Sequence, residues 1–292
     1  MQQNKCLYVS FNEIHATKIL LFPQKNITLP QNSNSITMIS KARIKWIKSL
    51  EMRKFRLQHQ AFVAEGPKLV GELLPYSTPL YIAATKDWLT QNSSLISKVK
   101  EVDEVSQAEL ERASLLRTPQ SVLAVMPIPQ RKLDISSLQD QLVIALDGVQ
   151  DPGNLGTILR IADWFGIHKV LCSEGPADVF NPKCVQSCMG ALARVEVFYC
   201  NLTEVLNEVE MPVYGTFLDG TDIYKEGLSQ NGIIVMGNEG NGISEEVSKL
   251  INRRLYVPNF PQGSQTTESL NVAVATGIVC AEFRRRMQTK LA

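Results

Sequence analysis

Three polar, glycine-rich segments interrupt apolar runs in the second half of the chain, and they restrict the possible folds more than any other feature. They occupy residues 147–160, 236–244 and 269–275. The first two follow an apolar run typical of a buried strand, and the third opens a long helical run. Open α/β sheets place their ligand sites in loops at the carboxyl ends of strands. The three segments therefore predict one site on one α/β sheet.

The chain from about residue 142 onward alternates between strand-like apolar runs and helical periods. Strands are expected at 142–146, 169–172, 195–199, 213–218, 232–236 and 255–257. Helices are expected at 155–165, 182–193, 203–209, 244–250 and 270–287. Apolar strands that alternate with helices predict a mainly parallel sheet covered on both faces.

A smaller α/β pattern precedes this sheet. A helix is expected after Ser40, a plausible N-cap, with further helices at 66–74 and 107–116. Strands are expected at 61–64, 80–84 and 122–126. Prolines at 127 and 129 interrupt helices and ladders alike. We therefore expect a first domain at 38–127, a linker at 128–141 and a second domain at 142–292.

Residues 1–37 differ from the rest, because they are rich in Asn, Gln, Ser and Thr and have no clean periodicity. The apolar residues 19–22 end at Pro23 and are too few for a signal peptide. Met38 opens a stretch that is typical of a folded N-terminus. We expect residues 1–37 to be a disordered extension, or translation to begin at Met38.

The net charge of +1 hides an uneven distribution of basic residues. Residues 41–56 hold seven basic side chains and one acidic one. A basic stripe fits a phosphate-rich partner, and a solvated helix face explains it equally well. The candidates for contact with a phosphate-rich partner in this basic helix are Lys41, Lys45, Lys48, Arg53 and Lys54.

The composition excludes several classes of protein. No apolar run approaches the roughly 18 residues of a membrane span. The six cysteines lie mostly within apolar runs, which indicates buried thiols in a reducing cytoplasm. His168 is the only histidine after residue 141, and no Cys/His ligand spacing accompanies it. A metal site and Ser-His-Asp chemistry are therefore not expected.

The three polar segments together resemble motifs 1, 2 and 3 of the SpoU (TrmH) RNA 2′-O-ribose methyltransferases, which belong to the SPOUT class. The resemblance rests on their order, their spacing and five residues: Asn154, Arg160, Glu239, Ser269 and Asn271. Residues 62–66 and 118–125 resemble the substrate-binding domain of this family. The resemblance implies a C-terminal SPOUT α/β domain with a deep trefoil knot, preceded by a small L30e-like α/β substrate-binding domain. It also implies a homodimer and the cofactor S-adenosylmethionine.

The same resemblance implies that those five residues are catalytic, with Arg160 holding the phosphate and ribose of the nucleotide. Since a free arginine is a poor base, we expect Arg160 to stabilise the developing alkoxide. A structural ion pair with Asp163 is the alternative for this arginine. We expect Asn271 to face inward, where its amide needs a ligand or a backbone partner.

The resemblance also implies a set of cofactor-binding residues. Backbone groups of Gly237, Val257 and Leu270 are implied to bind S-adenosylmethionine. The remaining members of this set are Thr216, Asn238 and Gly242. The segment 237–242 lacks the glycine order of a dinucleotide fingerprint and has no P-loop lysine, which disfavours a nucleotide-dependent oxidoreductase.

The sequence thus predicts a cytoplasmic RNA 2′-O-ribose methyltransferase with RNA as its partner and no metal or membrane. We expect rRNA as the substrate, with tRNA as the alternative. A second alternative is a non-catalytic RNA-binding ribosome-assembly factor of the same fold. The presence of Asn154, Arg160, Glu239 and Asn271 argues against that alternative.

Overall fold

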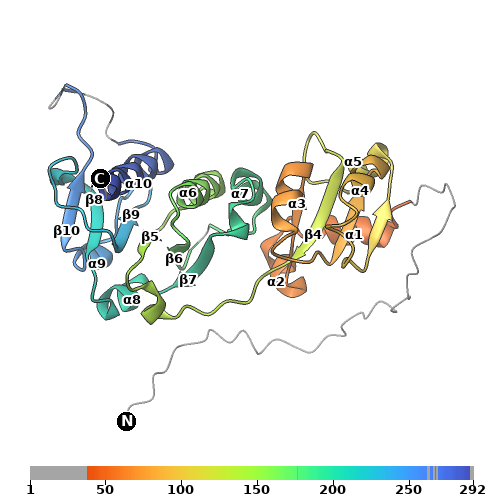
Figure 1. The fold of residues 1–292 in the computed structure, drawn as a ribbon, viewed down its shortest axis with the longest axis horizontal. Coiled ribbons are helices and arrows are strands. Elements are labelled where there is room, and N and C mark those ends of the chain that lie inside the picture. Colours follow the sequence, from red (N-terminus) through yellow and green to blue (C-terminus); the bar gives the residue numbers. More distant parts are fainter. Residues whose placement is uncertain (1–37, 176, 262–263, 266, 268, 290–292) are drawn as a thin grey trace, which may run out of the picture. The chain divides into compact units, whose positions relative to one another are not determined.

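The computed structural model describes residues 38–175, 177–261, 264–265, 267 and 269–289 (Figure 1). The expectation for residues 1–37 lies outside this range. None of the helices in the described part is long and apolar enough to cross a membrane. The described chain holds two sheets, of four and six strands.

The four-stranded sheet lies in the N-terminal part and has the order β1-β4-β2-β3. Strand β4 is antiparallel to both of its neighbours, whereas β2 and β3 are parallel. Apolar side chains of α1 and α5 pack on one face, and those of α3 and α4 pack on the other. The strands are β1 (Ala61–Glu65), β2 (Tyr81–Ala84), β3 (Val102–Glu104) and β4 (Val122–Pro127). The helices are α1 (Lys41–Ser49), α2 (Arg53–His59), α3 (Pro67–Leu73), α4 (Lys86–Gln91) and α5 (Gln107–Ala113).

The basic helix expected over residues 41–56 is in fact two helices, α1 and α2, so that prediction was wrong. Ser40 caps α1 as expected and accepts a hydrogen bond from the Arg43 amide at 3.2 Å. The chain turns after α1 because the Arg56 guanidinium donates to the carbonyls of Leu50 and Glu51, at 2.8 and 2.6 Å. Only 2% of the Arg56 side chain is exposed, so it cannot contact RNA.

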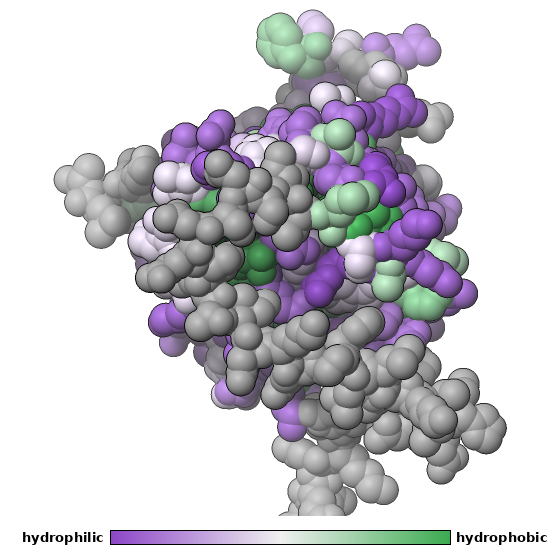
Figure 2. Space-filling view, turned by 90° about the vertical axis from the view of Figure 1, so that its right-hand side faces the viewer, coloured by the Kyte–Doolittle hydropathy of each residue, from purple (hydrophilic) through white to green (hydrophobic). Residues whose placement is uncertain are grey.

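The five proposed RNA contacts of this region are all exposed: Lys41, Lys45, Lys48, Arg53 and Lys54. The side of the molecule that carries the N-terminal domain is drawn in Figure 2. Where its atoms are coloured, hydrophilic surface predominates and apolar patches are small (Figure 2). This surface is compatible with contact to a polar partner, and it is equally compatible with a helix face that is only exposed to solvent.

The six-stranded sheet follows in the chain, with the order β10-β8-β9-β5-β6-β7 and parallel pairing throughout. Helices α10, α6 and α7 lie side by side on one face (Figure 1), and α8 and α9 pack on the other. The predicted parallel sheet with two covered faces is confirmed. Its strands are β5 (Leu142–Leu146), β6 (Lys169–Ser173), β7 (Glu196–Cys200), β8 (Val213–Asp222), β9 (Gly232–Met236) and β10 (Arg253–Tyr256). Its helices are η1 (Ile135–Leu138), α6 (Pro152–Trp164), α7 (Pro182–Ser187), η2 (Ala191–Ala193), α8 (Leu202–Glu208), α9 (Glu245–Ser248) and α10 (Val272–Thr289).

Strand β8 and helix α7 differ most in length from the expected elements of this sheet. Strand β8 is longer than expected. Its register with β10 shifts between Arg254 and Leu255, so residues 216–220 of β8 have no paired residue in β10. Helix α7 ends at Ser187 rather than continuing to residue 193. The helix is broken by Met189 and Gly190, whose φ values of +51° and +92° are both left-handed. A Cβ at Gly190 would lie 2.5 Å from the Cβ of Glu72, so glycine at this turn leaves room for the first domain.

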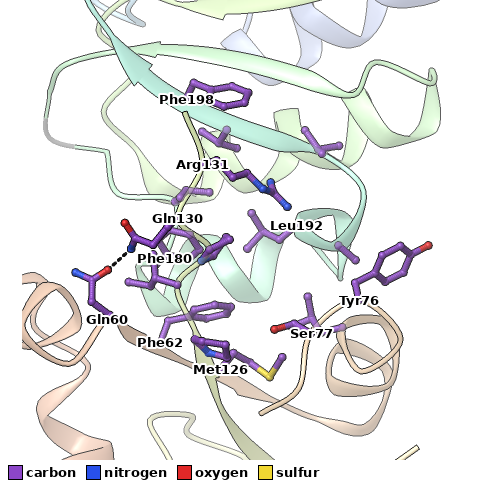
Figure 3. Close-up of a pocket in the computed structure, with 18 of the residues that line it drawn as sticks. Gln60, Phe62, Tyr76, Ser77, Met126, Gln130, Arg131, Phe180, Leu192 and Phe198 are labelled. Atoms are coloured by element: carbon purple, nitrogen blue, oxygen red, sulfur yellow. Dashed lines mark hydrogen bonds between the residues drawn. The ribbon is translucent and has the colours of Figure 1, made fainter. Parts of the chain in front are cut away.

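A cavity of about 490 Å³ lies where the first domain meets the second (Figure 3). The rings of Phe62 and Phe180 meet in it with their centroids 4.9 Å apart, and Leu192 lines the same space. The side chains of Gln60 and Gln130 are hydrogen-bonded at its edge (Figure 3). None of its lining residues belongs to the three polar segments. The cavity is therefore a feature of the domain junction and not the predicted site.

Candidate active site

The first two polar segments meet because strands β5 and β9 are neighbours in the sheet. The amide of Asp147, directly after β5, donates to the carbonyl of Met236 at the end of β9, at 2.9 Å. The Asp147 carboxylate is 8% exposed and accepts from the Ser244 amide at 2.7 Å. A buried carboxylate with a backbone donor holds the two loops in one arrangement.

One side chain from each segment joins a single hydrogen-bonded group, which we call the polar cluster (Asn154, Glu239 and Asn271). The Asn154 amide donates to Glu239 Oε1 at 2.8 Å. The Asn271 amide in turn donates to Asn154 Oδ1 at 3.0 Å. Glu239 and Asn271 are exposed, so the cluster is open to a ligand from solvent. The predicted convergence of the three segments is present in the structure.

Asp151 and Lys183 fix the position of Asn154, and the sequence did not single out either of them for this role. Asp151 is the N-cap of α6, and its Oδ1 accepts from the backbone N–H of Asn154 at 2.8 Å. Lys183 Nζ donates to the other Asp151 oxygen at 2.6 Å, and this hydrogen bond is the main cause that lowers the Asp151 pKa. The Asp-Pro pair at a helix start could have revealed Asp151. Nothing local to Lys183 indicates its partner.

The expectation that Asn271 faces inward was wrong, because its side chain is exposed. Its Oδ1 accepts from the amides of Ala273 and Val274, at 3.0 and 3.3 Å. The first amides of α10 lack intrahelical acceptors, and Asn271 supplies one as a cap. Its own amide is satisfied by Asn154. Ser269 is also exposed, and no hydrogen bond of its side chain is recorded within the described chain.

Arg160 lies on α6, as Asn154 does, but it is not part of the polar cluster. It follows Asn154 by six residues, which corresponds to about 9 Å along a helix axis. Its side chain is exposed, and the described residues provide it with neither a hydrogen bond nor an ion pair. The alternative of a structural pair with Asp163 is not realised, because Asp163 is bound by Arg194. The guanidinium is thus available to an external anion.

The loop after β9 is closed by its own hydrogen bonds. The backbones of Asn238 and Gly242 exchange two bonds, at 2.8 and 2.9 Å. The Asn238 side chain accepts from the amides of Gly240 and Asn241 and donates to the Gly148 carbonyl at 2.7 Å. A Cβ at Gly237 would overlap the Gly242 backbone, so the approach requires glycine. Asn238 therefore orders the loop and links it to the first segment.

The remaining predicted cofactor residues lie on β8 or follow β9 and β10, at the same edge of the sheet. Thr216 is on β8 and its hydroxyl lies 3.9 Å from Met236 Sδ. Gly237 follows β9, Val257 follows β10, and Leu270 precedes the cluster residue Asn271. In the part of the chain that the structure describes, no hydrogen bond is recorded for the backbone groups of these three residues. Unpaired backbone donors and acceptors beside an open loop fit a ligand that is bound through the main chain.

The geometry of the polar cluster is compatible with recognition of a polar ligand. No group of three or more His, Cys, Asp or Glu side chains that could hold a metal ion exists among the described residues. The polar cluster provides one carboxylate and two amides instead. Such groups can orient a hydroxyl and accept its hydrogen bond.

Two family models match the chain, one for each of its two domains. Residues 41–124 match the MRM3-like substrate binding domain, and residues 141–281 match the SpoU rRNA Methylase family. A curated relative from Bacillus subtilis, the 23S rRNA (guanosine(2553)-2′-O)-methyltransferase RlmP, is 33% identical over 246 residues. That alignment covers 83% of this chain and 96% of the relative.

Two solved structures superpose on most of the chain. A TrmH-family protein from Porphyromonas gingivalis is 43% identical, with a TM-score of 0.75 and coverage of 86% of this chain and all of that chain. An AdoMet-bound rRNA methyltransferase from Sinorhizobium meliloti is 26% identical, with a TM-score of 0.76 and coverage of 86% and 97%. The fold class predicted from the sequence is confirmed, while the trefoil knot stays a prediction. The chain belongs to the SpoU rRNA methylase family of RNA 2′-O-methyltransferases.

Proposed function

We propose that this protein transfers the methyl group of S-adenosylmethionine to a ribose 2′-hydroxyl of ribosomal RNA. The observation that carries the proposal is the polar cluster, in which Asn154, Glu239 and Asn271 join three segments that are far apart in the sequence. The family is one of RNA methyltransferases, and the alignment with RlmP, a relative named for 23S rRNA, covers 96% of that relative. No observation on this chain favours tRNA over rRNA.

S-adenosylmethionine supplies a methyl group that is already activated on a sulfonium. Backbone groups of Gly237, Val257 and Leu270 are the proposed holders of the cofactor, and their lack of partners within the described chain supports this role. Thr216 and Gly242 border the same region on β8 and on the loop after β9. Asn238 contributes by ordering that loop rather than through a free side chain.

The ribose is the proposed ligand of the polar cluster. Asn154 holds one oxygen of the Glu239 carboxylate, and the second oxygen has no partner within the described chain. That oxygen can accept a hydrogen bond from the 2′-hydroxyl and orient it. Ser269 is exposed, two residues from Asn271, and is the proposed further polar contact. Arg160 stabilises the charge that develops on the ribose oxygen.

We further propose that the protein is a homodimer and that Arg160 serves the site of the other copy. Arg160 is about 9 Å from Asn154 along α6, and among the described residues no hydrogen bond joins it to the polar cluster of its own chain. Trp164, one turn later, is 85% exposed, and Val274 on the neighbouring helix α10 is 53% exposed. Exposed apolar residues on two adjacent helices support pairing with a second copy.

The domain boundaries, the RNA-binding surface and the cellular location complete the proposal. We assign residues 38–127 to RNA binding, 128–141 to a linker and 142–292 to methyl transfer, in a cytoplasmic enzyme. The five described cysteines are free thiols, which supports a reducing compartment. The exposed cations of α1 and α2 are proposed to contact RNA phosphates: Lys41, Lys45, Lys48, Arg53 and Lys54.

The test is a methyl-transfer assay with tritiated S-adenosylmethionine and separately purified rRNA and tRNA. Label should enter rRNA from cells that lack the protein, and nuclease mapping should locate it on a ribose 2′-oxygen. The Glu239→Gln variant should bind the cofactor with unchanged affinity and transfer little label. Label on tRNA alone, or on a base, would contradict the proposal.

A further inference from the structure

Arg194 links helix α3 of the first domain to the C-terminal end of helix α6 in the second domain. Its Nε and Nη2 donate to the carboxylate of Asp163, at 2.9 and 2.8 Å. Its Nη1 donates to Glu72 of α3 at 2.7 Å. The side chain is 33% exposed, and that of Asp163 is 22% exposed. Arg194 thus holds one carboxylate from each domain with separate nitrogens of one guanidinium.

Asp163 is within reach of a second arginine, because it follows Arg160 by three residues on α6. Side chains three residues apart on a helix are neighbours and can form ion pairs. In the structure Asp163 is bound through both of its oxygens by Arg194, and Arg160 has no ion pair among the described residues. The pairing of Asp163 with one arginine therefore leaves the other free.

The local backbone favours this choice of partner. Arg194 directly follows η2, which begins after Gly190. Gly190 has a φ of +92°, and its missing side chain allows the close approach of Glu72. The turn therefore brings Glu72 and Arg194 together at the end of α6. A planar guanidinium can bind two carboxylates at once, whereas a point charge cannot match both.

We propose that Arg194 is a positioning residue that keeps Arg160 available for the RNA by occupying Asp163. The inference rests on the proposed role of Arg160 in methyl transfer. Without Arg194, Asp163 would retain its charge with no cation except Arg160 on its own helix. Arg160 would then be drawn into an intrahelical pair and away from the nucleotide. Removal of the Asp163 charge should release it again.

The test compares single and double variants at a temperature well below the melting temperature of each. Arg194→Met should lower kcat about fivefold, a factor that corresponds to the upper range for a partly exposed ion pair. The KM for S-adenosylmethionine should not change. Asp163→Asn added to Arg194→Met should restore the rate, because Arg160 no longer has a competing partner. Asp163→Asn alone should have nearly wild-type activity.

A matched control is Arg131→Met, because Arg131 lies in the linker at the domain junction and forms one ion pair, with Glu196 of β7. Its nitrogen lies 3.4 Å from Glu196, and it is 32% exposed, close to the exposure of Arg194. The Arg131 variant should keep the wild-type kcat. A drop equal to that of Arg194→Met would assign the effect to a looser domain junction and overturn the inference.

A double-mutant cycle with Arg160→Ala separates positioning from structural support. If Arg194 acts through Arg160, Arg194→Met should not lower the small residual rate of Arg160→Ala any further. An equal further loss, or no rescue by Asp163→Asn in a folded protein, would overturn the inference. An active Arg160→Ala variant would instead refute the proposed catalytic role. An inactive Arg160→Ala with a fully active Arg194→Met would refute only the inference.

Discussion

The proposed use of Arg160 across a dimer can be tested by pairing two defective chains. One chain carries Arg160→Ala and keeps its polar cluster, and the other carries Glu239→Gln and keeps its arginine. Each homodimer should lose at least ~10² in kcat, since each lacks a group that acts in the transition state. In the mixed dimer the two changes fall in the same site only if Arg160 serves the other copy. The second site of that dimer is then intact.

The expected magnitude follows from the two-fold symmetry of a homodimer. A purified mixed dimer has one intact site of two, so its kcat per dimer should be about half that of wild type. Unsorted dimers from equal co-expression contain about one half mixed dimers, so they should reach about a quarter of the wild-type rate. If Arg160 served its own chain, both sites of the mixed dimer would be defective. Its activity would then stay at the level of the two parents.

The assay uses two affinity tags, sequential purification and transfer of tritiated methyl to rRNA. The distance of about 9 Å along α6 between Arg160 and Asn154 is the reason to expect complementation. A mixed dimer of two Arg160→Ala chains with different tags controls for contamination by wild-type enzyme. A monomer by light scattering, or a mixed dimer no more active than its parents, would refute action across the dimer.

Three further predictions concern RNA binding and stability. Replacement of four exposed cations by glutamine should weaken rRNA binding and flatten the salt dependence of that binding. An unchanged salt dependence would show that these side chains are only solvated and do not contact phosphates. The four cations are Lys45, Lys48, Arg53 and Lys54. Arg56→Ala should lower the free energy of unfolding by about 3–5 kcal/mol in urea, because it leaves the largely buried Asp178 partner unpaired. The Asp151 pKa is lowered mainly by Lys183, so its contribution to stability is complete at neutral pH and lost as the pH falls through the folded pKa. Lys183→Met should therefore reduce the acid sensitivity of unfolding, and identical pH profiles would contradict this.

Local sequence patterns were sufficient for the elements that form the sheet and its loops. The apolar runs that became β5 and β9 have the expected bounds, and the polar loops after them are at the predicted edge. Patterns failed where a distant partner decides the structure. Arg56 looked like a surface cation, and it is buried because Asp178, 122 residues away, accepts its hydrogen bonds. Helix α7 ends early at the left-handed residues Met189 and Gly190, and the close approach of Glu72 to Gly190 cannot be read from local periodicity.

The candidate site depends on a pairing of strands that the sequence order does not indicate. Asn154 and Glu239 are 85 residues apart, and Asn154 and Asn271 are 117 apart. They meet because β9 pairs with β5, although β6, β7 and β8 lie between them in the chain. Periodicity predicted each loop, and the rule that open α/β sheets bind ligands at the carboxyl ends of their strands predicted that the loops share one site. The same reasoning explains the error at Asn271, since an inward amide and a helix cap have the same local sequence. Its partners, Asn154 and the first amides of α10, distinguish the two, and they exist only in the folded chain.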